Sequence, residues 1–531
     1  MSRAQPKFSP TDRYAKQIAR AIAKDRPPRF DDGLESYCES SPREIFAAFA
    51  GAARHMPPAG KDQALALGYI FVLQRLLEHL RYRTDRGYAD AAKLIADFQA
   101  DLTRRTEAGE LDGPILALLS GALHESKIPA SPEFAAAAAT RALAEAEDEP
   151  VADDPHDALA GIIRACGGHP FRIAGALLEA GHGRPTEHRA VLVTTLAFDS
   201  NPQARSAAVL FLLDPEAAIR REIAEALGQA AASLTATDVR RLIAIRNWRP
   251  EQERAQVDAV IRKARAAGIE CAQWEQGVVE AILASAIDGS EAQAFLVISP
   301  VGRKRRLSSI LTKGGVADAF SGEPERRRRL EEDMEAMGAP TLPVSRQYLD
   351  DIIADHMARG IAKGAVPPLG LLEVAETIGG ADWQPARKDF RKTLAGLVAE
   401  IPKPMREPGA LASVLRNSGE LPDLEVIAEA WFEDDPQVAN AVQRAGGRDR
   451  KKLASYLLQS VIERRREKWA DLLLRTAAWM RQAIPQDELC WRELALVAQA
   501  VAEGRDLNEI GLMRDIARRT VEVINENSGR V

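Results

Sequence analysis

The stretch DPEAAIRREIAEALGQ, residues 214–229, decides the fold class. Asp214 can cap a helix, and Pro215 suits the first helical turn, where a missing N–H costs nothing. Four apolar side chains then recur with the 3.6-residue period of a helix and form one stripe: Ile219, Ile223, Ala226 and Leu227. The stretch therefore predicts an amphipathic helix that opens with Asp214-Pro215 and buries one face.

The same stretch resembles the second helix of a HEAT repeat, where Asp-Pro, an arginine and an Ala-Leu-Gly ending recur. Here those positions are Asp214, Pro215, Arg220, Ala226, Leu227 and Gly228. Related Asp-Pro or Asn-Pro pairs begin at Asp154, Asn201 and Asp435. The resemblance implies stacked helix pairs in a degenerate α-solenoid. The pairs are irregularly spaced, so a non-repetitive helical bundle stays the alternative.

The composition favours helices over the whole chain of 531 residues. Hydrophobic residues make up 46% and aromatic residues only 5%, while alanine and leucine, both strong helix formers, dominate. One region departs from this pattern, because Ala294–Ser299 and Leu307–Thr312 are short apolar runs around a turn signal. We therefore predict an all-α protein of stacked helix pairs with one small β-containing insert.

Charge runs and prolines suggest five regions along the chain. The stretch 145–157 is acidic and contains two prolines, which is typical of an exposed linker. We predict an N-terminal helical region over 1–144, the acidic linker over 145–157, a HEAT-like helical region over 158–290, the insert over 291–345 and a C-terminal helical region over 346–531.

The totals exclude several classes of protein. The formal net charge is -6, so the chain does not coat nucleic acid over its whole surface. The longest uncharged runs are about 12 residues, short of the ~20 that span a bilayer, so no membrane association is expected. The four cysteines are far apart, which favours reduced thiols and a cytoplasmic location: Cys38, Cys166, Cys271 and Cys490.

The strongest candidate binding site is a run of cations after a turn signal. Arg303, Lys304, Arg305 and Arg306 follow Gly302, and their nearest acidic residue in sequence is Asp318. We predict that all four project from a loop, where they could bind a polyanion. A second basic run predicts ordinary helical ion pairs at i, i+4: Arg327 with Glu331, Arg328 with Glu332, and Arg329 with Asp333.

The sharpest acidic cluster is Asp350-Asp351 followed by Asp355-His356. On a helix, Asp351 and Asp355 share a face that could hold a divalent cation, although a solvated acidic face is the simpler interpretation. No histidine pair has the spacing of a helical zinc site, and no phosphate-binding glycine loop occurs. We predict no cofactor, no metal and no catalytic residue.

Three functions suit this sequence. The first is a non-enzymatic interaction scaffold that binds a protein partner on a helical-repeat surface, which needs no bond-breaking groups. The second is a nucleic-acid-associated protein that uses Arg303–Arg306. The third is a helical metal-dependent enzyme built around Asp351 and Asp355.

Overall fold

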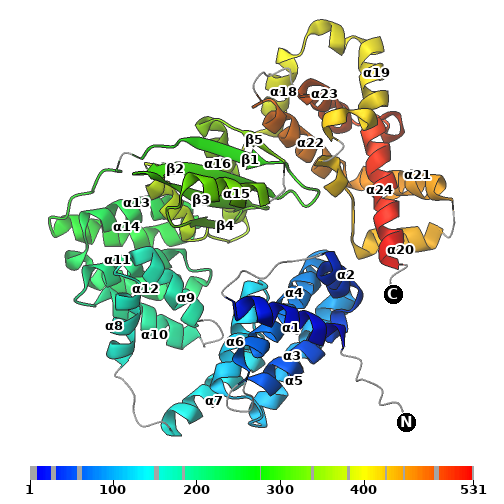
Figure 1. Ribbon diagram of the computed structural model, residues 1–531. Helices are drawn as coiled ribbons and strands as arrows, with labels where there is room; N and C mark the ends of the chain where they lie inside the picture. Colours follow the sequence, from blue (N-terminus) through cyan, green and yellow to red (C-terminus); the bar gives the residue numbers. More distant parts are fainter. Residues whose placement is uncertain are drawn as a thin grey trace, which may run out of the picture. The chain divides into compact units, whose positions relative to one another are not determined.

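The structure is a computed structural model in which most of the chain is described. The described residues are 9–24, 32–56, 62–148, 155–181, 186–275, 277–336, 340–379, 383–424, 427–445, 449–483 and 489–528. The chain forms two compact units, one of residues 1–167, 175–189 and 527–531, the other of residues 168–174 and 190–526. Helices dominate both (Figure 1), and the predicted all-α class with a small β-containing insert is confirmed.

The first unit is a helical bundle around one long helix. Its helices are α1 (Pro10–Ile22), α2 (Asp32–Ser40), α3 (Ile45–His55), α4 (Gln63–Asp85), α5 (Ala89–Glu107), α6 (Gly113–Glu125), α7 (Pro132–Asp148) and α8 (Pro155–Ala165). Because α4 packs against α1, α3, α5 and α6, it is apolar nearly all round. Ser9 Oγ caps α1 by accepting a hydrogen bond from the Asp12 N–H. The residues between α7 and α8, inside the predicted acidic linker, lie outside the described residues.

A layer of short helices follows. It comprises α9 (Pro170–Gly181), α10 (Thr186–Ala197), α11 (Pro202–Leu210), α12 (Ala217–Gln229), α13 (Ala236–Trp248) and α14 (Glu251–Ala266). Both α12 and α13 pack on α14, and Ile223 of α12 is fully buried. The predicted helix start at Asp214 is wrong. The Asp214 carboxylate instead accepts a hydrogen bond from the Glu216 N–H at 2.8 Å, which closes a turn before α12.

Two successive helices in this layer open on the same contact. Arg220 NH1 donates hydrogen bonds to the carbonyl oxygens of Asp214 and Pro215, at 2.7 and 2.8 Å. One helix earlier, Arg205 NH1 donates in the same way to the Asp199 carbonyl at 2.6 Å. Each arginine follows its aspartate by six residues, so its guanidinium fills the turn that leads into its own helix.

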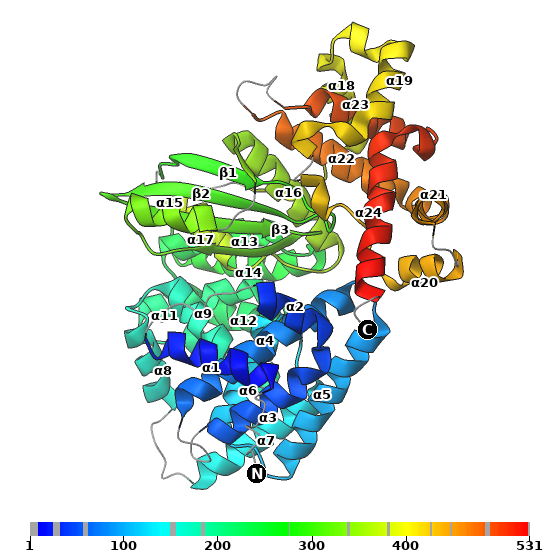
Figure 2. The ribbon, with the colours of Figure 1, turned by 45° about the vertical axis from the view of Figure 1, so that its right-hand side comes forward.

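The insert is a five-stranded antiparallel sheet with the order β4-β3-β2-β1-β5 (Figure 2). Its elements are β1 (Ala281–Ser285), β2 (Gln293–Val301), β3 (Lys304–Thr312), β4 (Val316–Ser321), α15 (Arg327–Ala336), β5 (Thr341–Pro343), α16 (Arg346–Ala362) and α17 (Gly370–Thr377). The predicted hairpin is β2–β3, whose two-residue turn begins at Gly302 with a φ of 60°. The sheet also takes in β1, which precedes the predicted insert boundary at residue 291.

Both edges of the sheet are occupied or shortened. On β4, the Asp318 carboxylate accepts a hydrogen bond from the Ala319 N–H at 2.9 Å. The start of α17 lies so close to this strand that a Cβ on Gly370 would collide with the Ala319 carbonyl oxygen. On the other edge, β5 has only three residues and ends at Pro343.

The remaining helices form the C-terminal part of the second unit. They are α18 (Phe390–Glu400), α19 (Pro408–Asn417), α20 (Pro436–Ala445), α21 (Arg450–Ser460), α22 (Arg466–Met480), α23 (Trp491–Ala502) and α24 (Gly511–Ser528). Two buried indoles tie this part to the sheet region: Trp431 Nε1 donates to the Ile287 carbonyl at 2.9 Å, and Trp479 Nε1 donates to the Ala284 carbonyl at 3.0 Å. Of the helices described, none is long and apolar enough to cross a membrane.

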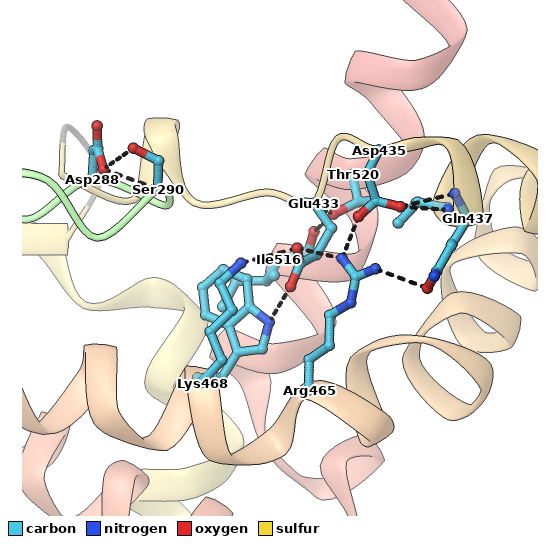
Figure 3. Close-up of polar contacts among 11 residues, drawn as sticks. Asp288, Ser290, Glu433, Asp435, Gln437, Arg465, Lys468, Ile516 and Thr520 are labelled. Atoms are coloured by element: carbon cyan, nitrogen blue, oxygen red, sulfur yellow. Dashed lines mark hydrogen bonds and ion pairs between the residues drawn. The ribbon is translucent and has the colours of Figure 1, made fainter. Parts of the chain in front are cut away.

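A buried carboxylate holds the C-terminal helices together (Figure 3). Glu433 is 4% exposed and accepts hydrogen bonds from Arg465 NH1 at 2.7 Å, Lys468 Nζ at 3.0 Å and Trp469 Nε1 at 2.9 Å. Its backbone N–H donates to Thr520 Oγ1 of α24 at 3.0 Å. Because its carboxylate has several partners, this burial is compensated, and we interpret the cluster as structural.

Candidate functional site

Two neighbouring hollows lie between the C-terminal helices. The larger, which we call the groove, measures about 890 Å³ and lies between α18, α22 and α23. The smaller, which we call the pocket, measures about 390 Å³ and lies between α16, α18 and α22. Phe390 and Asp471 line both hollows, so the two are continuous along α18 and α22.

The groove has an apolar floor and a rim of both charges. One wall is a single face of α18, from Phe390 through Leu394 to Val398. Its cations are Arg391 and Arg406, for which the described residues provide no ion-pair partner. The opposite wall, from α22 and α23, has the acidic residues Glu467 and Glu503.

The pocket has an apolar wall and an unusual arginine. Ile352, Leu397 and Leu474 are among its lining residues, and so is Arg475, whose side chain is 8% exposed. Arg475 NH2 donates to His356 Nε2 at 3.2 Å. Within the described part of the chain, its Nε and NH1 atoms are buried without a hydrogen-bond partner, and so is the hydroxyl of Tyr348.

Burial of His356 between this arginine and a backbone carbonyl keeps the imidazole neutral. Its Nδ1 lies 3.2 Å from the Gly315 carbonyl oxygen, so Nδ1 carries the proton and Nε2 accepts from Arg475. Burial, followed by the positive charges of Arg475 and Arg359, lowers the pKa of His356 to about 3, although the Asp355 carboxylate opposes this.

The neutral imidazole predicts a loss of stability in mild acid. As the pH falls below about 6.5, the unfolded chain gains a proton on His356 that the folded chain does not take up, so the unfolding free energy decreases. Between pH 7.5 and 5 this residue should account for about 2 kcal/mol. Urea unfolding followed by tryptophan fluorescence at both pH values should show that loss in the wild type.

The variant His356→Gln tests this origin, because glutamine keeps one donor and one acceptor but does not titrate. Its stability should change about 2 kcal/mol less between the two pH values. The exposed His188 provides the matched control, and His188→Gln should behave like the wild type. An equal pH dependence in wild type and His356→Gln would contradict the assignment.

The acidic cluster of the sequence lies beside the pocket, and its carboxylates are neutralised. Asp351 pairs with Lys388 Nζ at 3.2 Å, and Asp355 pairs with Arg359 Nε at 2.6 Å. Burial opposes ionisation of Asp355, but the Lys388 N–H and Arg359 outweigh it and lower the pKa of this carboxyl group. Over the described residues, no group of three or more metal-binding side chains could hold an ion. Carboxylates already paired with cations are poor ligands for a metal.

The basic turn differs from its prediction. Only Gly302 and Arg303 form the turn, and Lys304, Arg305 and Arg306 belong to strand β3. The prediction that all four project from a loop is therefore wrong, because the tight two-residue hairpin leaves no longer loop. Arg303 and Lys304 are exposed, whereas Arg305 and Arg306 are half-buried.

The fold also supplies acidic neighbours that the sequence did not reveal. Arg305 forms an ion pair with Glu280, and its backbone exchanges hydrogen bonds with Glu325. Arg306 lies close enough to Glu373 to oppose the rise that burial causes in the pKa of that carboxyl group. Arg303 and Lys304 thus remain as the cations of this run that have no ion-pair partner among the described residues.

The second basic run forms the expected kind of helical pairs. Arg327 pairs with Glu331 at 2.8 Å and Arg328 pairs with Glu332 at 2.9 Å, as predicted. Arg329 pairs backwards with Glu325 at 3.1 Å. The side chain of Asp333, its predicted partner, lies outside the description.

The sequence analysis missed Arg475 and Tyr348. A usable signal exists for the arginine, because it interrupts the apolar run Leu472-Leu-Leu-Arg475-Thr-Ala-Ala-Trp-Met480, where a helix buried on most sides is expected. A charged residue inside such a run must find a partner or a ligand. Tyr348 carries no comparable signal, since buried tyrosines are common.

Two family models match parts of the chain. The model of the Y4lR second domain matches residues 185–268, which correspond to α10–α14. The model of the Y4lR C-terminal helical domain matches residues 391–525, which correspond to nearly all of α18–α24. Neither is a HEAT-repeat model. No curated protein and no solved structure matches the chain.

The two matches bracket the sheet region. The groove lies almost wholly inside the part similar to the Y4lR C-terminal helical domain, from Arg391 to Glu503. The pocket combines α18 and α22 of that part with α16, which precedes it.

Proposed function

We propose that the chain is a non-enzymatic interaction scaffold whose groove receives an amphipathic helix of a protein partner. The observation that carries the proposal is the shape and chemistry of the groove: an open hollow of about 890 Å³ with an apolar floor between helices. Such a hollow accepts a helix that places apolar residues at i, i+3, i+4 and i+7 against the floor.

The rim defines the charge pattern of the partner helix. Arg391 and Arg406 stand on the α18 side, and Glu467 and Glu503 stand on the other. A helix with acidic residues along one flank and basic residues along the other complements both sides. Opposite charges at a rim set orientation and association rate more than affinity, which suits a reversible scaffold.

The layer α10–α14 supports the scaffold proposal independently. The repeated arginine contacts of Arg205 and Arg220 give successive helices the same start, as expected of a HEAT-like stack. The free cysteines Cys38, Cys166, Cys271 and Cys490 agree with a reducing compartment such as the cytoplasm.

The groove can be blocked from its exposed wall. Ala502 is exposed and lines the groove, so Ala502→Trp should fill it without disturbing the core. In capture experiments from the native cell, a true partner should bind the wild type and be reduced at least about tenfold with Ala502→Trp, a loss of about 1.4 kcal/mol. The exposed Ala410 lies on α19 outside the groove, and Ala410→Trp should leave capture unchanged.

The captured partner must also supply the expected helix. Its binding segment, made as a synthetic peptide, should become helical on binding and should bind more weakly to Arg391→Glu than to the wild type. The proposal is overturned if Ala502→Trp captures the same proteins as the wild type, or if the bound segment is extended.

Binding of nucleic acid is supported less well. The predicted site, Arg303 to Arg306, keeps only two exposed cations without an ion pair among the described residues, because Arg305 and Arg306 face Glu280 and Glu373. Two phosphate contacts give a weak and strongly salt-dependent affinity.

A further inference from the structure

We propose that the pocket between α16, α18 and α22 binds a small organic monocarboxylate, held by Arg475 and Tyr348. The inference goes beyond the proposed scaffold function and does not rest on it. It starts from two buried polar side chains that line the same hollow of about 390 Å³ and lack hydrogen-bond partners in the described chain.

Arg475 is the uncompensated charge of the pocket. The carboxylates of the lining are paired with other cations: Asp351 with Lys388, Asp355 and Asp471 with Arg359, and Glu400 with Arg481. Arg475 has no carboxylate within ion-pair distance in the described part of the chain, and its one hydrogen bond goes to the neutral His356. A guanidinium more than nine-tenths buried is costly in this state, and an anion would relieve the cost.

Tyr348 adds a second donor. Its hydroxyl is buried without a partner among the described residues, and burial raises the pKa of the phenol to about 12, so it remains protonated at neutral pH. A carboxylate can accept hydrogen bonds from a guanidinium and a phenol at once. The two groups together therefore match one carboxylate better than they match a neutral ligand.

The remaining lining defines the body of the ligand. Ile352, Phe390, Leu397 and Leu474 provide apolar surface, and the volume lies at the small end of the range for ligand sites. A single uncompensated cation matches a single negative charge, whereas a dianion such as phosphate would leave excess charge beside Asp355 and Asp471. The chemistry points to a monocarboxylate with an apolar body.

The test uses the full chain and a series of probes from acetate to benzoate and phenylpropionate, followed by calorimetry and thermal unfolding. A member with an apolar body should bind saturably below ~10 mM and raise the melting temperature, because it binds only the native state. Benzyl alcohol, which lacks the charge, and inorganic phosphate should bind at least about tenfold more weakly.

Two variants connect binding to the named side chains. Arg475→Met should weaken carboxylate binding at least about tenfold, and Tyr348→Phe should weaken it severalfold while keeping the fold, because it removes only an unpartnered hydroxyl. The control Arg391→Met changes an exposed cation of the groove and should bind the probes like the wild type. If Arg475→Met does not fold, Tyr348→Phe alone decides between the outcomes.

Three results would overturn the proposal. They are the absence of binding by every carboxylate of the series, unchanged binding by the Arg475→Met or Tyr348→Phe variant, and phosphate binding as strong as carboxylate binding. None of these results bears on the groove, since Ala502 and Arg391 line only the larger hollow.

Discussion

Glu433→Ala should lower the stability of the C-terminal helices by about 3–5 kcal/mol, the range for removing one partner of a buried ion pair. The carboxylate accepts from Arg465, Lys468 and the indole of Trp469, and Trp469 is fully buried. Its removal leaves that indole N–H without an acceptor and Lys468 without its counter-ion. Arg465 keeps a partner in Asp435, at 2.5 Å, which limits the loss.

Hydrogen exchange with mass spectrometry is the suitable measurement, because a chain of two units need not unfold in one step. Peptides from α22 and α24 should exchange faster in Glu433→Ala, while peptides from α4 should not change. Glu429 is exposed, and Glu429→Ala should leave exchange as in the wild type. Equal protection of α22 in wild type and Glu433→Ala would show that the cluster does not hold these helices.

Ile223→Asp should destabilise the layer α10–α14 by several kcal/mol, because it places an unpaired charge in a fully buried position between helices. The aspartate would face the contact of α12 with α14. Exchange in peptides from both helices should increase, and the variant should be more soluble in urea-unfolded form than in native buffer.

The neighbouring Glu225 provides a control on the same helix. It is exposed, so Glu225→Asp changes a side chain of the same charge at the surface and should cost only a few tenths of a kcal/mol. An unchanged exchange pattern in Ile223→Asp would mean that this face of α12 is not packed against its neighbours as the structure has it.

The helices were predictable where their own sequence carried the signal. The stripe around Ile223 and the cap at Ser9 are local patterns, and both led to the correct element. The strand β1 was missed because Ala281-Ile-Leu-Ala284 does not favour a strand by itself. Its pairing with β2, from Ala281 with Ile298 onwards, overrides that local preference.

The sites were less predictable, because ion pairs and pockets join residues that are distant in the chain. Glu280 neutralises Arg305 across 25 residues, and Arg475 meets His356 across 119. No periodicity connects such pairs. The acidic residue Asp355 was visible in the sequence, but its cation Arg359 decides that it is a structural partner and not a metal ligand.

The sheet edges restrict how any partner can bind. Strand addition needs a free row of backbone N–H and carbonyl groups along an exposed edge. At the β4 edge, Asp318 occupies the Ala319 N–H and α17 approaches its carbonyl, while Pro343 cannot donate on β5. The sheet is therefore protected against both β-augmentation by a ligand strand and edge-to-edge aggregation, and recognition falls to the helices.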